Sequence, residues 1–274
     1  MVTRECDMRC GICWSFGLPP AQSVPVAQKL EMIDIVHADG VRKVIFTGGE
    51  PLLEAALPEL LRHAKSKGLE TWLFTNCMHM RERQAEILPH IDRISISLDG
   101  STARRNRKAH GKGQFERVLD TLAMLRTAEP EFAGVVQVLT VVTRKNKRDL
   151  KRIGKLLREQ KQGLRFRWKL NFYLPIGRFN RRYQLEYRKF RQWADRTEAR
   201  FPDIKVYVSP PVHDRAYLFI MPDGAMYTTE GAKYVCLGNI FERSSYEVEA
   251  LHEIEVNMTK KGRLKRGLPE DGLG

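Results

Sequence analysis

The stretch KVIFTGGEP, at residues 43–51, joins a short apolar run to a turn of two glycines, an acidic residue and a proline. Further apolar runs occur at 71–74, 93–98, 135–142 and 166–174. Longer amphipathic segments lie around them, at 25–38, 57–68, 81–88, 115–125, 147–159 and 183–199. Short strands that alternate with helices are typical of a parallel sheet built from βα units. We therefore expect an α/β fold.

The composition indicates a globular protein with a basic surface. The chain has 274 residues, 42% hydrophobic and 29% charged, and a formal net charge of +14. No apolar stretch is long enough to cross a bilayer and the N-terminus has no apolar signal core, so we expect a cytoplasmic protein without a membrane partner. The basic segments 104–112, 144–155 and 178–191 fit solvated helix faces, and they also fit an anionic partner. Nucleic acid is the less favoured partner, because no aromatic-interleaved RNA-binding motif accompanies the charge.

Three of the five cysteines form a C-x3-C-x2-C motif, at Cys6, Cys10 and Cys13. An odd number of cysteines clustered in this way argues against a disulfide framework and for a metal centre in a reducing compartment. Three thiolates at this spacing reach three corners of one iron–sulfur cube and leave the fourth iron open. The spacing alone also fits a three-cysteine zinc site that is completed by a residue such as His37.

The cysteine motif followed by Gly-Gly-Glu-Pro closely resembles the radical S-adenosylmethionine (SAM) superfamily. Weaker matches follow in order at Phe74-Thr75-Asn76, Ser95 to Gly100, Val142-Thr143 with Asn146, and Leu174 to Arg178. The resemblance covers about residues 4–243 and implies a partial (βα)6 TIM-like barrel with a small C-terminal αβ cap. Every matched motif lies at the end of an expected strand, and the ends of parallel strands form the rim on which barrel enzymes build their sites.

The resemblance also implies the chemistry and the residues that serve it. Cys6, Cys10 and Cys13 are expected to be catalytic as the ligands of one [4Fe–4S] cluster, which cleaves SAM reductively to a 5′-deoxyadenosyl radical that abstracts hydrogen from an organic substrate. The glycines of the turn are expected to approach the SAM ammonium, which donates a hydrogen bond to the acidic residue beside them. Polar residues at later strand ends would bind the ribose or carboxylate, and an isoleucine would meet the adenine. The expected cofactor-binding residues are Gly48, Gly49, Glu50, Pro51, Asn76, Ser95, Ser97, Thr143, Asn146 and Ile176.

Three parts of the chain are expected. Residues 1–200 form the radical SAM barrel core, and its first strand is expected to be missing because Met1 lies five residues before Cys6. Residues 201–257 form a cap that resembles SPASM or twitch extensions, and residues 258–274 form a disordered tail. Such extensions bind auxiliary clusters through several cysteines, but Thr229 stands where the first would be and only Cys236 remains. We therefore expect a single cluster.

Two positions depart from the family pattern. Ile12 stands where an aromatic residue usually precedes the last cysteine, and Trp14 is a candidate substitute. Cys77 stands where glycine is common after Thr-Asn, and it is either a substrate-facing thiol or a buried inert one. The same two alternatives hold for Cys236.

The substrate is expected to be a peptide or protein, because residues 109–115 and 221–227 resemble stretches of peptide-modifying radical SAM enzymes. The alternative is a viperin-like enzyme that modifies a nucleotide, which Arg167-Trp168-Lys169 and the basic segments favour; Trp168 also fits a core position. His110 is the histidine that best suits a substrate site. The expected electron donor is a flavodoxin or ferredoxin. A non-enzymatic metal-binding or RNA-binding module is the remote alternative.

Overall fold

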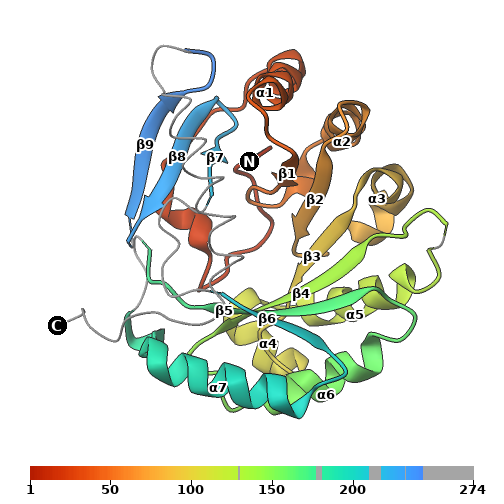
Figure 1. The fold of residues 1–274 in the computed structure, drawn as a ribbon, viewed down its shortest axis with the longest axis vertical. Coiled ribbons are helices and arrows are strands. Elements are labelled where there is room, and N and C mark those ends of the chain that lie inside the picture. Colours follow the sequence, from red (N-terminus) through yellow and green to blue (C-terminus); the bar gives the residue numbers. More distant parts are fainter. Residues whose placement is uncertain (129, 177–180, 210–216, 232, 243–274) are drawn as a thin grey trace.

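A computed structural model describes residues 1–128, 130–176, 181–209, 217–231 and 233–242. Its centre is a six-stranded parallel sheet in which each strand pairs with the next along the chain (Figure 1). The strands are β1 (Lys43–Phe46), β2 (Glu70–Thr75), β3 (Arg93–Ser97), β4 (Val135–Val142), β5 (Phe166–Phe172) and β6 (Lys205–Val208). The α/β fold expected from the alternating pattern is confirmed.

Helices cover the outer face of the curved sheet (Figure 1). They are α1 (Val26–Ala38), α2 (Leu57–Ser66), α3 (Met80–Ile87), α4 (Ala103–His110), α5 (Gln114–Leu125), α6 (Leu150–Gln160) and α7 (Tyr187–Arg200). Short 3-10 turns lie at Trp14–Gly17 (η1), Pro51–Leu53 (η2), Leu88–His90 (η3) and Arg181–Tyr183 (η4). All the expected helices are present within a few residues, and α4 is an addition.

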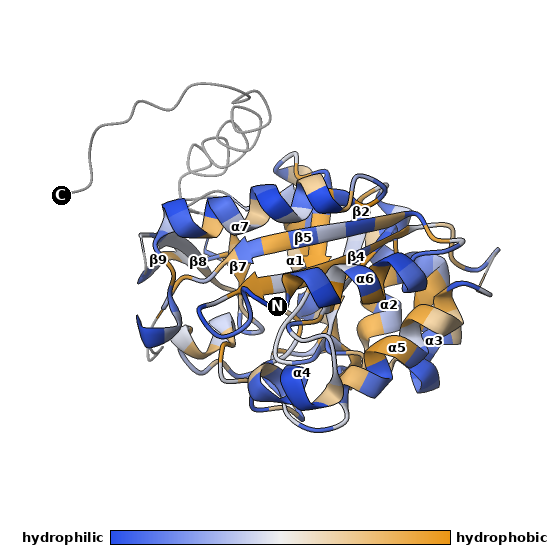
Figure 2. Cartoon of the chain, turned by 90° about the horizontal axis from the view of Figure 1, so that it is seen from below, coloured by the Kyte–Doolittle hydropathy of each residue, from blue (hydrophilic) through white to orange (hydrophobic). Residues whose placement is uncertain are grey.

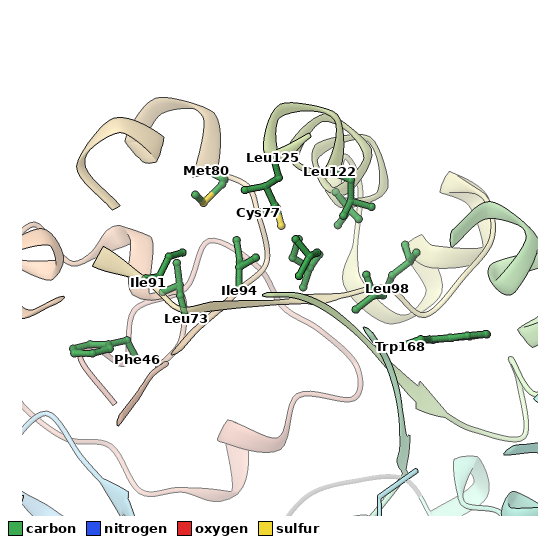
Figure 3. Packing of buried hydrophobic residues seen from close by; sticks show 14 of the residues in the cluster. Phe46, Leu73, Cys77, Met80, Ile91, Ile94, Leu98, Leu122, Leu125 and Trp168 are labelled. Atoms are coloured by element: carbon green, nitrogen blue, oxygen red, sulfur yellow. The ribbon is translucent and has the colours of Figure 1, made fainter. Parts of the chain in front are cut away.

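The main core fills the space between the sheet and these helices. Ile94 and Leu98 of the β3 segment meet Leu122 and Leu125 of α5 there, and Cys77 lies among them (Figure 3). Side chains alternate across a strand, so the next residue, Ser95, points to the opposite, concave face. That face is where the rim motifs can gather.

The sixth strand is not the one expected. β6 lies beyond residue 200, where the barrel was expected to end, but it pairs in parallel with β5 from Arg167↔Lys205 to Leu170↔Val208. It therefore belongs to the main sheet, and the cap begins later. At the other edge, Thr3 forms an isolated parallel bridge with Gly48, so the N-terminal segment runs alongside the end of β1.

A separate antiparallel sheet forms the cap. Its strands are β7 (Phe219–Ile220), β8 (Ala225–Glu230) and β9 (Lys233–Asn239), and β7 and β8 form a hairpin. Met226 and Ile240 pack against Met32 and Val36 of α1 in a second small core. Residues 243–257 of the expected αβ cap and the tail at 258–274 lie outside the described residues.

Helix α4 accounts for the first basic segment. It carries four arginines and lysines, and hydrophilic residues dominate its surface (Figure 2). Asn106 and His110, one turn apart, are its buried residues. Among the described residues, no helix has both the length and the apolar character needed to span a membrane.

Candidate active site

The N-terminal segment that carries the cysteines is fixed to the end of β1 by backbone hydrogen bonds. Val2 N donates to Thr47 O over 2.8 Å, Gly49 N to Thr3 O over 3.0 Å, and Glu50 N to Glu5 O over 2.7 Å. The bonds end one residue before Cys6. The cysteine loop therefore starts from a fixed point on the rim.

This pairing explains the two glycines of the turn. A Cβ at Gly48 would lie 2.3 Å from Thr3 O, and one at Gly49 would lie 2.0 Å from Glu5 O. Both distances are far below van der Waals contact, so residues with side chains would push the N-terminal segment off the rim. The glycines thus serve the approach of two protein backbones, and their expected approach to SAM stays a prediction.

Glu50 ties three parts of the rim together. Its carboxylate accepts hydrogen bonds from Leu52 N at 3.1 Å, Thr75 Oγ1 at 2.7 Å and Asn76 N at 2.7 Å. The side chain is 1% exposed, and burial raises its pKa to about 7 in spite of these donors. Pro51, the next residue, begins η2. A carboxylate with three protein donors is primarily a structural link between the ends of β1 and β2.

Asp7 provides a second anchor for the cysteine loop. Its carboxylate accepts from Asn76 Nδ2 over 2.9 Å and lies 3.1 Å from His79 Nε2. Asn76 thereby connects the loop to the end of β2. The sequence placed Asn76 in the site but gave no indication of Asp7 or His79.

The three cysteines differ in their surroundings. Cys6 is exposed, whereas Cys10 and Cys13 are partly buried. Cys13 Sγ lies 3.1 Å from Ser15 Oγ. Burial, followed by the neighbouring thiols of Cys13 and Cys6, raises the pKa of Cys10 to about 12. Thiolates are thus disfavoured here unless positive charge is bound beside them, as metal binding provides.

Cys10 has a buried histidine behind it. His110 Nδ1 lies 3.5 Å from Cys10 Sγ, and His110 Nε2 lies 2.6 Å from Asp99 Oδ2. His110 was expected at the substrate site, and the structure places it against a cysteine of the motif instead. Its position at the C-terminal end of α4 depends on a helix that the sequence analysis did not predict.

The polar residues at the ends of β3 and β4 make local bonds. Ser95 Oγ accepts from Gln137 Nε2 at 3.1 Å. Asn146 Oδ1 accepts from Thr143 N at 2.8 Å, and its Nδ2 donates to Val141 O at 2.9 Å. Ser97 is partly exposed at the end of β3. These residues share the rim with the cysteine loop, and their bonds to SAM remain predictions.

A cavity of about 700 Å³ lies between the concave face of the sheet and the cap. Residues of β1 and β5 form one wall, including Ile45 and Lys169, and Ile12 from the cysteine motif adjoins it. Ile176, the expected adenine contact, also lines this cavity. Gly177 and Arg178 of the same motif lie outside the described residues. The volume falls in the usual range for small-molecule sites.

The cap touches the cysteine loop directly. The ring of Trp14, the residue after Cys13, lies 5.2 Å from that of Phe219, and Phe219 lies 5.7 Å from Tyr234 in edge contact. Tyr234 Oη also donates to Trp14 O over 3.1 Å. Trp14, which follows the last cysteine, therefore borders the cavity together with Phe219 and Tyr234 of the cap.

A family model described as the radical SAM superfamily matches residues 1–157, more than half of the chain. The chain belongs to the radical SAM superfamily. Enzymes of this superfamily use a [4Fe–4S] cluster and SAM, so the resemblance drawn from the cysteine and Gly-Gly-Glu-Pro motifs is confirmed at this level.

Curated radical SAM relatives align with part of the chain. The AdoMet-dependent heme synthase of Oleidesulfovibrio alaskensis is 31% identical over 182 residues, 65% of this chain and 45% of that protein. The GTP 3′,8-cyclase of Chlorobaculum tepidum is 34% identical over 128 residues, 45% of this chain and 39% of that protein. The chain spans less than half the length of these two relatives.

Solved structures share the fold. The structure of anSMEcpe with bound AdoMet has a TM-score of 0.70 and 18% identity, covering 92% of this chain and 80% of that one. Streptococcus suis SuiB bound to precursor peptide SuiA has a TM-score of 0.67 and 15% identity, covering 82% of this chain and 57% of that one. At these identities the likeness concerns the fold alone.

The residues present fit the radical SAM cluster. Soft thiolates are its natural ligands, and three of them lie on one anchored loop. Within the described residues no three His, Cys, Asp or Glu side chains are grouped as ligands of a single metal ion. A cube binds its thiolates through three different irons, which differs from the single-ion geometry of the zinc alternative.

A half-buried cation beside the loop supports the same fit. Arg4 Nη2 donates to Leu18 O over 3.2 Å, while its Nη1 is buried and has no partner among the described residues. Burial lowers the pKa of Arg4, and the neighbouring Cys13 opposes that shift. An unpaired guanidinium N–H next to the thiols suits an anionic group such as a thiolate-bound cluster.

The two remaining cysteines lie apart from the motif. Cys77 is 1% exposed, faces the core on the helix side of the sheet (Figure 3), and has a positive φ of 71°. The positive φ explains why glycine suits this position. Burial raises the pKa of the Cys77 thiol, which favours the inert alternative. Cys236 is exposed on β9 of the cap.

Proposed function

We propose that this radical SAM enzyme abstracts hydrogen from a peptide or protein substrate that enters between the barrel and the cap. The observation that carries the proposal is the cavity of about 700 Å³, which the cysteine loop borders at Ile12 and Trp14 and the cap borders at Phe219 and Tyr234. Cofactor and substrate can meet there without a long transfer path. The aliphatic and aromatic wall excludes water from a reactive radical.

The protein's part in the reaction is positioning. When bound, the cluster and SAM together supply one-electron cleavage to a 5′-deoxyadenosyl radical. Cys6, Cys10 and Cys13 would hold the cluster, and the backbone pairing at Gly48 and Gly49 would keep their loop on the rim. We further propose a single cluster, because the cap offers Cys236 as its one cysteine up to residue 257.

SAM is proposed to lie along the rim that the expected cofactor-binding residues share. Ile176 would contact the adenine, because it lines the cavity beside the cysteine loop. Glu50, Pro51 and Asn76 would form the part of the site that holds the methionine portion of SAM. The remaining members of the set are Gly48, Gly49, Ser95, Ser97, Thr143 and Asn146.

Structural neighbours support a peptide as the substrate class. The anSMEcpe enzyme has been solved with AdoMet and the peptide Kp18Cys, and SuiB with its precursor peptide SuiA. Both cover most of this chain, including part of the cap region. A peptide side chain can use the apolar walls of the cavity.

A nucleotide substrate is the second candidate, and Lys169 is the observation that favours it. Lys169 lines the cavity together with Lys43 and Arg42. Its neighbour Trp168 cannot assist, because it is buried on the other face of β5 and donates from Nε1 to Thr140 Oγ1 over 2.9 Å. The core alternative for Trp168 is therefore confirmed.

The test begins with anaerobic reconstitution. The proposal expects about four irons per chain and formation of 5′-deoxyadenosine from SAM under a strong reductant. One zinc per chain and no cleavage of SAM would instead support a metal-binding module. A flavodoxin or ferredoxin is the proposed electron donor, and it should replace the chemical reductant in the same assay.

Deuterium transfer then separates the two substrate classes. Candidate peptides encoded near the gene, deuterated at carbon, should stimulate SAM cleavage and pass deuterium into 5′-deoxyadenosine. Deuterated nucleoside triphosphates should pass none. Transfer from a nucleotide alone would replace the peptide proposal by the nucleotide one.

A further inference from the structure

Cys10, His110 and Asp99 form a buried line that runs inward from the cysteine loop. His110 is 7% exposed and Asp99 is 3% exposed. The contacts are 3.5 Å from Cys10 Sγ to His110 Nδ1 and 2.6 Å from His110 Nε2 to Asp99 Oδ2. One imidazole ring therefore connects a cysteine thiol to a carboxylate.

The line is held in place from both ends. Asp99 Oδ1 accepts from Val141 N over 2.6 Å, which fixes the carboxylate to β4. The backbone N of Asp99 donates to Asn106 Oδ1 over 2.9 Å, which also ties this residue to α4. Gly11 N donates to Ala109 O over 3.0 Å, which draws the cysteine loop onto the end of the same helix. The histidine has little freedom to turn away.

The direction of these bonds follows from the chemistry of the groups. A metal-bound thiolate and an ionised carboxylate both accept hydrogen bonds and donate none. With Cys10 bound as a thiolate, His110 Nδ1 is the donor in the contact with its sulfur. The ring then places a donated hydrogen bond next to one sulfur of the cluster.

We propose that His110, held by Asp99, is a positioning residue that orients Cys10 and raises the reduction potential of the cluster. This inference rests on the proposed function, since it needs the cluster to be bound. Hydrogen bonds to cluster sulfurs are among the factors that set its potential, and a donor favours the more negative, reduced state. Cys13 Sγ lies 3.1 Å from the neutral hydroxyl of Ser15, so the thiolates of Cys10 and Cys13 would have different hydrogen-bond partners.

The test is the midpoint potential of the reconstituted cluster, measured by anaerobic titration with the electron paramagnetic resonance signal of the reduced form as readout. His110→Phe removes the donor and keeps a ring. We expect its equilibrium constant for reduction to fall about tenfold, a shift of about 59 mV to more negative potential for one electron. His79→Ala is the matched control, because His79 contacts Asp7 of the same loop but no cysteine sulfur in that contact.

Asp99→Asn provides a second variant. It leaves His110 in place, and the amide oxygen can still accept from Val141 N. The equilibrium constant for reduction should fall by less than tenfold, and the potential should shift in the same direction as in His110→Phe. The reason is that the ring keeps its donor toward Cys10 but loses the carboxylate that holds it. If His110→Phe fails to hold about four irons, this variant decides the question.

The outcomes separate the two proposals. An unchanged potential in loaded His110→Phe, or in Asp99→Asn where His110→Phe does not load, would overturn the role of His110. An equal shift in His79→Ala would also overturn it, because any disturbance of the loop would then suffice. A wild-type chain that assembles no cluster would instead refute the proposed function itself.

Discussion

The barrel rim and the cap hold the cysteine loop by different physical means. On the rim, backbone pairing, the buried Glu50 and the exposed Asp7 fix the loop through directed hydrogen bonds. On the cap side, Trp14 meets Phe219 and Tyr234 through ring contacts and one hydrogen bond. Directed bonds tolerate little displacement, whereas apolar contacts can repack. The rim therefore holds the cysteine loop more rigidly than the cap does.

The largest expected effect is the loss of the metal centre itself. Cys10→Ala removes one of three thiolate ligands, so iron content should fall from about four per chain to background and no 5′-deoxyadenosine should form. Iron analysis and chromatography of the products measure both. The exposed Cys236 of the cap supplies the control, since Cys236→Ser should leave iron and SAM cleavage at wild-type levels. A loss of iron in Cys236→Ser would mean that the cap also ligates metal.

Breaking the backbone pairing should have the next largest effect. In Gly49→Ala the new Cβ would overlap Glu5 O, so the N-terminal segment must leave the rim. We expect at least a fivefold loss of bound iron and a decrease of about 3 kcal/mol in the free energy of unfolding.

Gly163→Ala is the comparison for this variant. Gly163 has a φ of +72° and open space around it, so alanine there should cost only about 1 kcal/mol and leave iron unchanged. Equal iron in both variants would show that the rim pairing is dispensable.

The buried carboxylate of the rim predicts a pH dependence that the cap contacts lack. Burial raises the pKa of Glu50 from 4.5 to about 7, so the folded state binds this proton more tightly than the unfolded state. Stability should therefore be highest below about pH 4.5 for this group and decrease as the pH rises to about 7, by on the order of 3 kcal/mol.

Urea unfolding of wild type and Glu50→Gln across this pH range measures the difference. The amide introduced by Glu50→Gln does not titrate, so the variant should lack the pH dependence of stability that comes from Glu50. The other acidic groups contribute to the pH dependence of both proteins. If the free energies of unfolding of the two proteins changed in parallel with pH, the assignment of this pH dependence to Glu50 would be contradicted.

The smallest effect is expected at the cap. Tyr234→Phe removes the hydrogen bond to Trp14 O and keeps the ring contact with Phe219, so it should cost about 1 kcal/mol in the free energy of unfolding. Iron content should remain that of wild type, in contrast to Gly49→Ala. Iron loss in this conservative variant would show that the cap contact is as necessary for iron binding as the rim pairing.

The barrel could largely be predicted from the sequence because its apolar runs are clear. Residues 135–142 were expected as a strand and form β4 with the same bounds. Helix α4 was missed because Asn106 and His110, its buried residues, are both polar and give no apolar period. The available signals were Thr102, which caps its first turn, and Gly111, which ends it at a φ of 93°. β6 was assigned to the cap because four residues do not reveal their partner strand.

The site could be predicted only as far as local motifs reach. The spacing of the cysteines indicates a cluster because neighbouring residues supply its ligands. The contact between Cys10 and His110 joins residues 100 positions apart, and it depends on how the missed helix packs. The sequence also gave no reason for a glycine at position 49, because the group that a side chain there would overlap is the carbonyl of Glu5.

The bond between Tyr234 and Trp14 joins positions 220 residues apart, so the order of synthesis matters. The segment bearing Cys13 is synthesised before the barrel strands, and β9 is made more than 200 residues later. Chains fold from the N-terminus as they emerge. The flank of the loop that faces β7 and β9 is consequently uncovered while the barrel strands are being made, which leaves a period in which iron can be delivered before the aromatic cover closes.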